Sequence, residues 1–365
     1  MAARCLVCLI SACLQVSAQQ HVRVDLRQWG YKSPETAESR FQTKLSSQTI
    51  SVGPSGEIVA GFVTRDRTEL ARRDIPPLSL HVLRFAKNGK FLAQGAVPTP
   101  SWYENAVFEG SHDTLLIRAG TELYLFSLKM ERLADKDLPP TPNSGMIDWK
   151  IRPLSDRDAF LLYNYRKADT SVALLRWSDL RPIKQCAYDS NNQLLSVFKT
   201  NLLSFRHGGA KDPLRRTAEV SEICGPSRFT YSWEGDSTNA ALVDDDTFIL
   251  AGGSSSVSVV VGDKVRWKDA FDRKSDIVSS HVEVSADSQL LAIAVKRFAG
   301  GSRVLDVSRK LKTVRIIVYQ AKSGKKVFES TVNPSPSDSF DFALSPDGGV
   351  LAIVSDGFVE IIQLR

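Results

Sequence analysis

The sequence predicts an all-β fold, a β-propeller of seven four-stranded blades. No long stretch of the 365 residues carries the 3.6-residue apolar period of an amphipathic helix, and short runs rich in Val, Ile, Leu, Phe and Tyr are broken instead by Gly, Asp, Asn, Ser and Pro. A polar turn followed by an apolar strand recurs about every 49 residues. Such an interval has room for the four short strands of one blade.

Seven turn-and-strand units carry this repeat. They begin at Ser51, Phe108, Pro153, Ser190, Leu242, Val284 and Leu344. The sixth blade shows its four strands most clearly, at Val282–Ser285, Leu290–Val295, Val314–Gln320 and Lys326–Val332. The unit from Ser190 is the least regular, so six and eight blades remain as alternatives to seven.

The two ends of the chain predict how the ring closes. The last unit, from Ser339, supplies only three strands, and its final apolar run would leave an unpaired edge. Near the other end, His21 to Leu26 (HVRVDL) is an alternating strand with no partner close by in sequence. We therefore expect this N-terminal strand to complete the last blade.

The first 18 residues have the pattern of a signal peptide. Arg4 precedes a mostly apolar run from Cys5 to Val16, which is too short to remain as a membrane-spanning helix, and small residues then lead to a cleavage site before Gln19. We expect an exported protein, periplasmic or secreted, with a single propeller domain over residues 19–365 and no transmembrane helix once the leader is removed. Ile10-Ser11-Ala12-Cys13 also resembles a bacterial lipoprotein site, so a lipidated Cys13 is the alternative.

Two cysteines, Cys186 and Cys224, follow this leader. An oxidising compartment allows them to form a disulfide. Two separate buried thiols are the alternative, because a separation in sequence says nothing about the geometry that a disulfide needs.

Two of the units resemble a known superfamily. SADSQLLAIAV and SPDGGVLAIVS are similar to the blade cores of WD-repeat-like and related bacterial periplasmic propellers, although the Gly-His and Trp-Asp signatures of true WD repeats are missing from every unit. The resemblance implies a binding scaffold, with enzymes a minority. It transfers no functional residue, because no family motif for a site is present.

Basic loops suggest where a partner would bind. The net charge is +6, and in a propeller the loops between the second and third strands share one face with the loops that join blades. We expect that face to bind an anionic partner, which is an unknown protein, an acidic glycan or an envelope component. The expected binding residues are Arg65, Arg67, Arg72, Arg73, Lys211, Arg215, Arg216, Lys296, Arg297, Arg303, Arg309, Lys310 and Lys312. Solvated loops without a partner are the alternative, and nucleic acid is disfavoured because aromatic residues are not interleaved with the basic ones.

Signals of catalysis are weak. The histidines are scattered without the spacing of a metal site, no GxSxG motif occurs, and the glycine pairs lack the strand-then-helix context of phosphate loops. We therefore expect a non-catalytic, monomeric binding or scaffold protein without cofactor or metal. The alternative function is a propeller hydrolase or lactonase, which needs carboxylates or amides converging on a metal near the central axis. A purely structural envelope component is a third hypothesis.

Overall fold

The fold is taken from a computed structural model of the chain. It describes residues 20–31, 41–44, 49–66, 78–100, 105–110, 113–138, 149–154, 158–164, 169–189, 192–207, 215–234, 239–252, 254–299, 310–332, 340–355 and 357–364. The predicted leader over residues 1–18, with Cys13, lies outside these ranges. None of the described helices is both long and apolar enough to cross a membrane.

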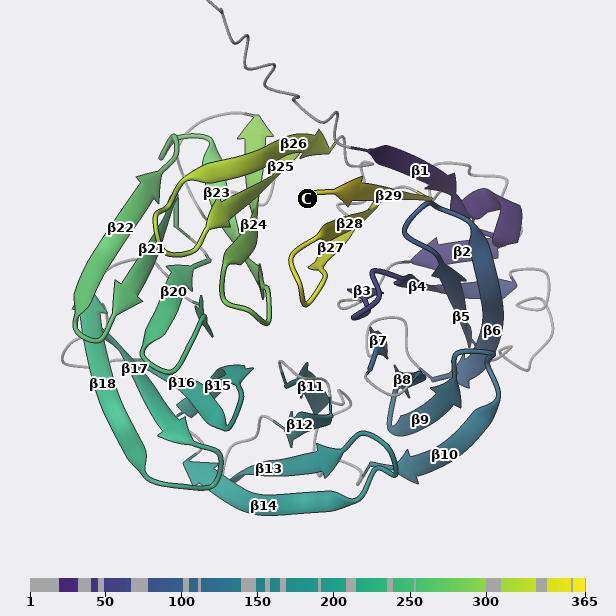
Figure 1. The fold of residues 1–365 in the computed structure, drawn as a ribbon, viewed down its shortest axis with the longest axis horizontal. Coiled ribbons are helices and arrows are strands. Elements are labelled where there is room, and N and C mark those ends of the chain that lie inside the picture. The colour runs from purple at the N-terminus through teal and green to yellow at the C-terminus, as the bar shows by residue number, and fades with distance from the viewer. Residues whose placement is uncertain are drawn as a thin grey trace, which may run out of the picture.

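The described strands form seven sheets that surround a central axis (Figure 1). Blade 1 contains β2 (Phe41–Lys44), β3 (Ile50–Val52), β4 (Ile58–Asp66), β5 (Leu78–Phe85) and β6 (Phe91–Thr99). Blade 2 contains β7 (Asn105–Glu109), β8 (Thr114–Ala119), β9 (Glu122–Ser127) and β10 (Arg132–Asp137). Blade 3 contains β11 (Trp149–Pro153), β12 (Ala159–Asn164), β13 (Asp169–Arg176) and β14 (Pro182–Asp189).

The remaining blades follow the same order from the axis outward. Blade 4 contains β15 (Asn192–Phe198), β16 (Asn201–His207), β17 (Arg215–Glu222) and β18 (Ser227–Glu234). Blade 5 contains β19 (Asn239–Leu242), β20 (Thr247–Ala251), β21 (Ser256–Val261) and β22 (Lys264–Ala270). Blade 6 contains β23 (Asp276–Val284), β24 (Leu290–Ala299), β25 (Lys310–Gln320) and β26 (Lys326–Val332). Blade 7 contains β27 (Phe340–Leu344), β28 (Val350–Ser355), β29 (Phe358–Gln363) and, outermost, β1 (His21–Asp25).

The predicted closure of the ring is confirmed. β1 pairs antiparallel with β29, from His21 opposite Ile362 to Asp25 opposite Phe358. The backbone N–H of Gln363 donates to the carbonyl of Gln20 at 3.0 Å, so the pairing extends one residue beyond the strand. A 3-10 turn, η1 (Leu26–Trp29), then leads the chain from blade 7 towards blade 1. Both predictions, seven blades and an N-terminal strand in the last one, therefore hold.

The two units with the strongest family resemblance share one turn. The hydroxyl of Ser285 donates to Asp287 at 2.6 Å, and that of Ser345 donates to Asp347 at 2.6 Å. Each serine hydroxyl also accepts a backbone N–H from the first residue of the next strand, Leu290 or Val350. These bonds satisfy the backbone groups that a tight turn leaves unpaired, which explains why this sequence pattern starts a blade.

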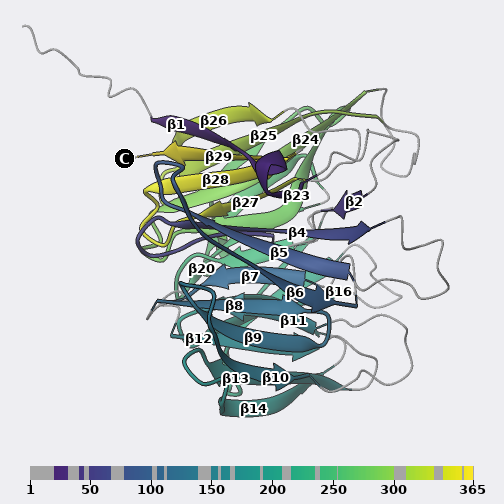
Figure 2. The ribbon, with the colours of Figure 1, turned by 90° about the vertical axis from the view of Figure 1, so that its right-hand side faces the viewer.

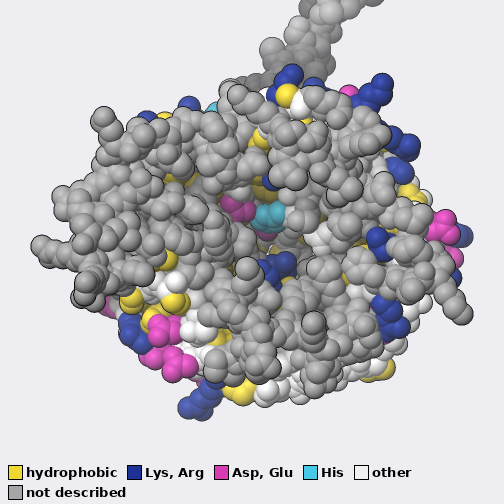
Figure 3. Space-filling view, turned by 180° about the vertical axis from the view of Figure 1, so that it is seen from behind, with side chains coloured by type: hydrophobic (Ala, Val, Ile, Leu, Met, Phe, Trp, Pro, Cys, Tyr) yellow, Lys and Arg dark blue, Asp and Glu magenta, His cyan; other side chains and the backbone are white. Residues whose placement is uncertain are grey.

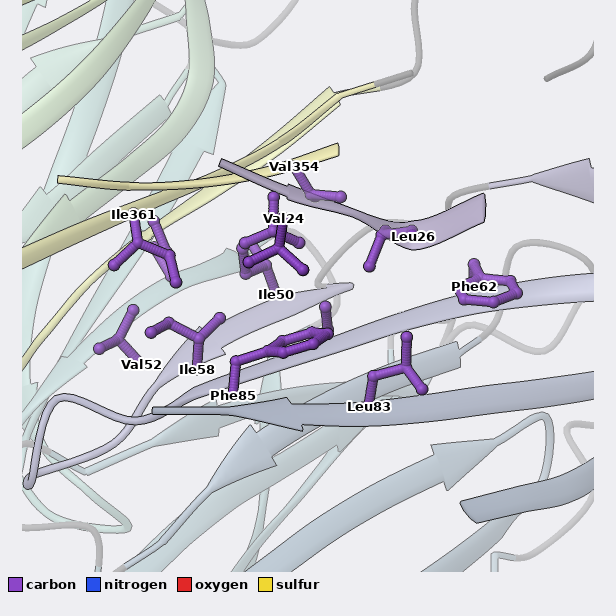
Figure 4. Close-up of a cluster of buried hydrophobic side chains, with 14 of the residues drawn as sticks. Val24, Leu26, Ile50, Val52, Ile58, Phe62, Leu83, Phe85, Val354 and Ile361 are labelled. Atoms are coloured by element: carbon purple, nitrogen blue, oxygen red, sulfur yellow. The ribbon is translucent and has the colours of Figure 1, made fainter. Parts of the chain in front are cut away.

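Apolar side chains from facing sheets fill the space between neighbouring blades. Figure 4 shows the cluster between blades 7 and 1, where Val24 of β1 and Val354 of β28 meet Ile50, Ile58 and Phe85 of blade 1. The outer strand therefore contributes to the core and does more than cover an edge. Burying these side chains is the main favourable contribution to joining the two blades.

The connections at the two faces of the ring differ. Tight turns within the blades project from one face, which we call the turn face, and which lies on the left in Figure 2. The second and third strands of each blade, and consecutive blades, are connected at the opposite face, which we call the loop face.

Candidate functional site

The loop face carries the candidate site. Figure 3 shows this face, with a hollow at its centre in which a histidine lies beside acidic side chains. The innermost strands of the blades line the axis. A partner that covered the loop face would reach the side chains in this hollow.

Six of the thirteen predicted basic residues cannot be placed. Arg67, Arg72, Arg73, Lys211, Arg303 and Arg309 lie outside the described residues. The backbones of Arg65 and Lys310 lie at the loop-face ends of β4 and β25. The five with described side chains, at the loop-face ends of β17, β24 and β25, are Arg215, Arg216, Lys296, Arg297 and Lys312.

Arg297 is committed to an ion network inside blade 6. Its Nε and Nη2 atoms donate to the two carboxylate oxygens of Asp276 at 2.7 and 3.0 Å. Arg315 donates to the same carboxylate at 3.0 Å and to Glu329 at 3.0 Å. Burial alone would raise the pKa of Asp276, but the hydrogen bond and charge of Arg297 and the charge of Arg315 hold it below its ordinary value. This network joins all four strands of the blade and leaves Arg297 little capacity to bind a partner.

Lys296 and Lys312 are more available. The Lys296 ammonium lies 5.3 Å from the centre of the Phe340 ring, within the range of a cation–π contact. Lys312 is exposed near the start of β25 and has no ion-pair or hydrogen-bond partner among the described residues. Arg215 is likewise exposed at the start of β17. The described part of the loop face therefore offers isolated positive charges on blades 4 and 6.

A charged cluster near the axis was not predicted from the sequence. His281 lies on β23, where the pairing with β24 shifts between Val278 and Val282. Such a bulge changes the direction in which a side chain points. His281 and Glu283 lie two residues apart on one strand, so their side chains share a face of the sheet, and the His281 ring stacks on Phe342 of blade 7 at 4.5 Å.

Both nitrogens of the His281 ring contact carboxylates. Nε2 lies 2.7 Å from Oε1 of Glu283, and Nδ1 lies 2.9 Å from Oδ1 of Asp341. Carboxylates only accept hydrogen bonds, so both ring nitrogens donate and the imidazole is positively charged. Burial on its own lowers the pKa of His281, but the hydrogen bonds and charges of Asp341 and Glu283 outweigh it and raise the pKa to about 10.

Asp341 connects three consecutive blades. Its Oδ2 atom accepts the backbone N–H of Thr49, which precedes the innermost strand of blade 1, at 2.8 Å. Its Oδ1 atom accepts from His281 of blade 6 and from the N–H of Phe342 at 3.0 Å. The side chain is only 6% exposed. This carboxylate therefore holds blades 6, 7 and 1 together on the side of the ring where the chain closes.

In this state His281 offers neither a general base nor a metal ligand. A doubly protonated histidine has no lone pair with which to accept a proton or bind a metal. Within the described part of the chain, no group of three or more His, Cys, Asp or Glu side chains has the arrangement of a metal site. The axial hydrolase hypothesis needs free carboxylates or amides, whereas Asp341 and Glu283 bind His281.

The two cysteines are joined across a blade boundary. Cys186 on β14, the outermost strand of blade 3, forms a disulfide with Cys224, in the turn between β17 and β18 of blade 4, and their Cα atoms are 5.6 Å apart. The Tyr188 hydroxyl accepts the N–H of Cys224 at 2.8 Å. The pair therefore fixes one blade to the next at the turn face.

Comparisons with known proteins identify the fold. No family model and no curated protein matches the sequence. Among solved structures, the WD40 domain of coronin from Toxoplasma gondii is 12% identical, with 94% of this chain and 86% of that chain covered and a TM-score of 0.52. The WD40 domain of Pan2 from Neurospora crassa is 11% identical, with coverages of 88% and 89% and a TM-score of 0.51. BBS1N, in a complex with ARL6DN, is 12% identical, with coverages of 88% and 93% and a TM-score of 0.52.

Identities this low show the fold alone. They agree with the propeller fold described above. The chain is a seven-bladed β-propeller, and its fold is similar to that of these WD40 domains.

Proposed function

We propose that this protein is an exported, monomeric and non-catalytic scaffold that binds an anionic partner on its loop face. One observation carries the proposal. The strand ends from which the predicted basic segments continue, those of β4, β17, β24 and β25, all lie at the loop face. Long loops on a rigid ring are well suited to binding, and their positive charge favours an acidic protein surface, an acidic glycan or anionic envelope groups.

Two further points support binding over catalysis. The charged groups near the axis are bound to one another in the cluster of His281, Glu283 and Asp341. Solved propellers with this fold include BBS1N in its complex with ARL6DN, which is a protein partner. The leader-like first 18 residues support export. An exported protein would meet acidic components of the envelope.

The test is capture of a partner from an envelope extract at low and at moderate salt. In one variant, Lys296, Arg303, Arg309, Lys310 and Lys312 are replaced by Gln, while Arg297 is kept because it binds Asp276. In the matched control, Lys87, Lys90, Lys264, Arg266 and Lys268, exposed in the β5–β6 turn on the turn face or on the outer strand of blade 5, are replaced by Gln. We expect capture by the native protein and the control, weaker capture at higher salt, and loss in the blade 6 variant. Equal capture by all three proteins would contradict the proposal.

A further inference from the structure

A groove on the turn face opens between blades 6 and 7. It has a volume of 420 Å³. Leu290 of β24, Val327 of β26 and Leu364, just after β29, provide its apolar lining. Leu290 and Leu364 also belong to the core between these two blades. Val327 is 37% exposed, apolar residues near the start of other outer strands are exposed as well, and the Val327 side chain faces the groove. We call this site the closure groove.

The way in which the ring closes explains why the groove is present. At other boundaries, the turn between the third and fourth strands of one blade covers the outer strand of the preceding blade. Gly89 lies against Val22, Met130 lies against Gly95, and Gly324 lies against the Trp267 indole. In blade 7 the third strand is β29 and the fourth is β1, so no turn joins them. The outer strand of blade 6 lacks the cover that such a turn provides.

The equivalent boundary between blades 5 and 6 shows what a covering segment does. There, the Trp267 indole donates its N–H to the carbonyl of Ala321 at 2.7 Å, beneath the turn that follows. Leu364 occupies in blade 7 the position that Ala321 occupies in blade 6. The N–H of Leu364 donates to the carbonyl of Gly349, and the N–H of Ala321 donates to the carbonyl of Gln289. A segment that enters the closure groove would take the place of the missing turn.

The polar rim indicates what would bind. Gln289 and Gln320 each use one end of the side-chain amide within the chain, through the Asp287 carbonyl and the Ser323 hydroxyl. The amide oxygen of Gln289 and the amide nitrogen of Gln320 have no hydrogen-bond partner among the described residues, and they offer one acceptor and one donor to a peptide backbone. Lys322 lines the groove, and of the described side chains that do so none is acidic.

We propose that the closure groove docks a short extended segment of a partner protein, with one apolar side chain and a carboxylate close to it. The apolar side chain contacts Leu290, Val327 and Leu364, and the carboxylate pairs with Lys322. The site lies on the turn face, so it is independent of the function proposed for the loop face.

The proposal is tested with the purified full chain and a displayed library of random peptides of about seven residues, which span roughly 23 Å when extended. Enriched peptides are then synthesised and titrated calorimetrically. We expect them to share an apolar residue with Asp or Glu beside it. Val327→Arg places a charged side chain in the groove and should weaken binding by more than about tenfold, and Lys322→Glu should weaken it about fivefold.

The controls are Val265→Arg and Lys264→Glu, which change an exposed valine and lysine at the start of the outer strand of blade 5. Both should keep the native affinity within about twofold. The blade 6 loop-face variant should also bind the peptide normally, which separates this proposal from the proposed function. A library without a shared pattern, or a peptide that binds Val327→Arg as well as the native protein, would overturn the proposal.

Discussion

The carboxylate of Asp341 accepts hydrogen bonds from residues of three consecutive blades. It is almost fully buried, and its partners are the Thr49 backbone, the His281 ring and the Phe342 backbone. A buried carboxylate is tolerated only when its oxygens are bound, and removing one partner leaves an unpaired charge. Substituting a single residue of the cluster of His281, Glu283 and Asp341 should therefore lower the stability of the whole ring.

We expect Asp341→Ala to lower the free energy of unfolding by about 3 kcal/mol, because the His281 charge then loses its buried partner. Urea denaturation followed by tryptophan fluorescence measures this change. Glu360→Ala is the control, since Glu360 forms only long ion pairs with His21 and Arg23 of β1. An Asp341→Ala protein as stable as this control would show that the contacts of Asp341 contribute little.

His281 should make the stability depend on pH. Its pKa rises from 6.5 to about 10 on folding, so the folded state holds a proton that the unfolded state releases. The contribution of His281 to the free energy of unfolding is fully present below pH 6.5, falls as the pH rises, and is lost above about pH 10. We expect urea denaturation to show this decline in the native protein and a smaller one in His281→Gln. Parallel pH profiles would contradict the assignment.

At the scale of single strands, the disulfide and the N-terminal strand have separate effects. The Cys186–Cys224 bond crosses a blade boundary in the middle of the chain, whereas β1 joins the last blade to the rest. The disulfide limits the conformational freedom of the unfolded chain, whereas β1 covers the edge of β29 in the folded protein. Their removal should therefore be detected by different measurements.

We expect the double variant Cys186→Ser, Cys224→Ser to lose up to about 4 kcal/mol of stability, because the bond closes a loop with a sequence separation of 38 residues. Reducing agent should lower the unfolding midpoint of the native protein to that of the variant. It should leave the variant itself unchanged. A native protein that is insensitive to full reduction under denaturing conditions would contradict this expectation.

We expect Val24→Asp to detach β1, because Val24 is buried against blade 1 while its backbone pairs with β29. The cost should be about 3 kcal/mol, from lost apolar burial and a carboxylate placed in the core. The exposed β29 edge should then promote association, which light scattering detects. Arg23→Gln, on the exposed side of the same strand, should remain monomeric, and equal scattering by both variants would contradict the interpretation.

The architecture of the whole molecule could be predicted from the sequence because repeated turns and strands are local features. The turn at Ser345 and the strands after it follow the sequence pattern. Blade 6 has its four strands where they were expected, and three of them extend further towards the loop face. The irregular unit from Ser190 is a true blade, whose pairing shifts between Leu194 and Ser196. A bulge of this kind breaks the alternation that predicts a strand.

The site could be predicted only in part. His281 and Glu283 share a strand face, which their spacing alone could have indicated, but Asp341 and Thr49 meet them only through the closure of the ring. The pairing of Arg297 with Asp276 also depends on strand register, so a list of basic residues overstates the charge available to a partner. Contacts between blades follow from the fold and not from local sequence.

A circular permutant tests the whole ring. A short linker from the C-terminal end to Gln20, with new ends between Gly262 and Asp263, supplies the turn that blade 7 lacks. We expect a folded ring with stability within about 1 kcal/mol of the native value, because the joined ends are already adjacent. Denaturation and circular dichroism measure this. The linker should also cover the closure groove and abolish peptide binding there, whereas unchanged binding would argue against the groove.

The pairing of β1 with β29 also determines when folding can finish. β1 is made first and its partner is the last strand of the described chain, so the N-terminal strand waits unpaired while the blades between them are synthesised. Until then, the apolar face of β1 and the edges of the unfinished ring are open to proteases and to chaperones. For this protein, the slow step that limits the yield of native molecules should be the joining of its two ends.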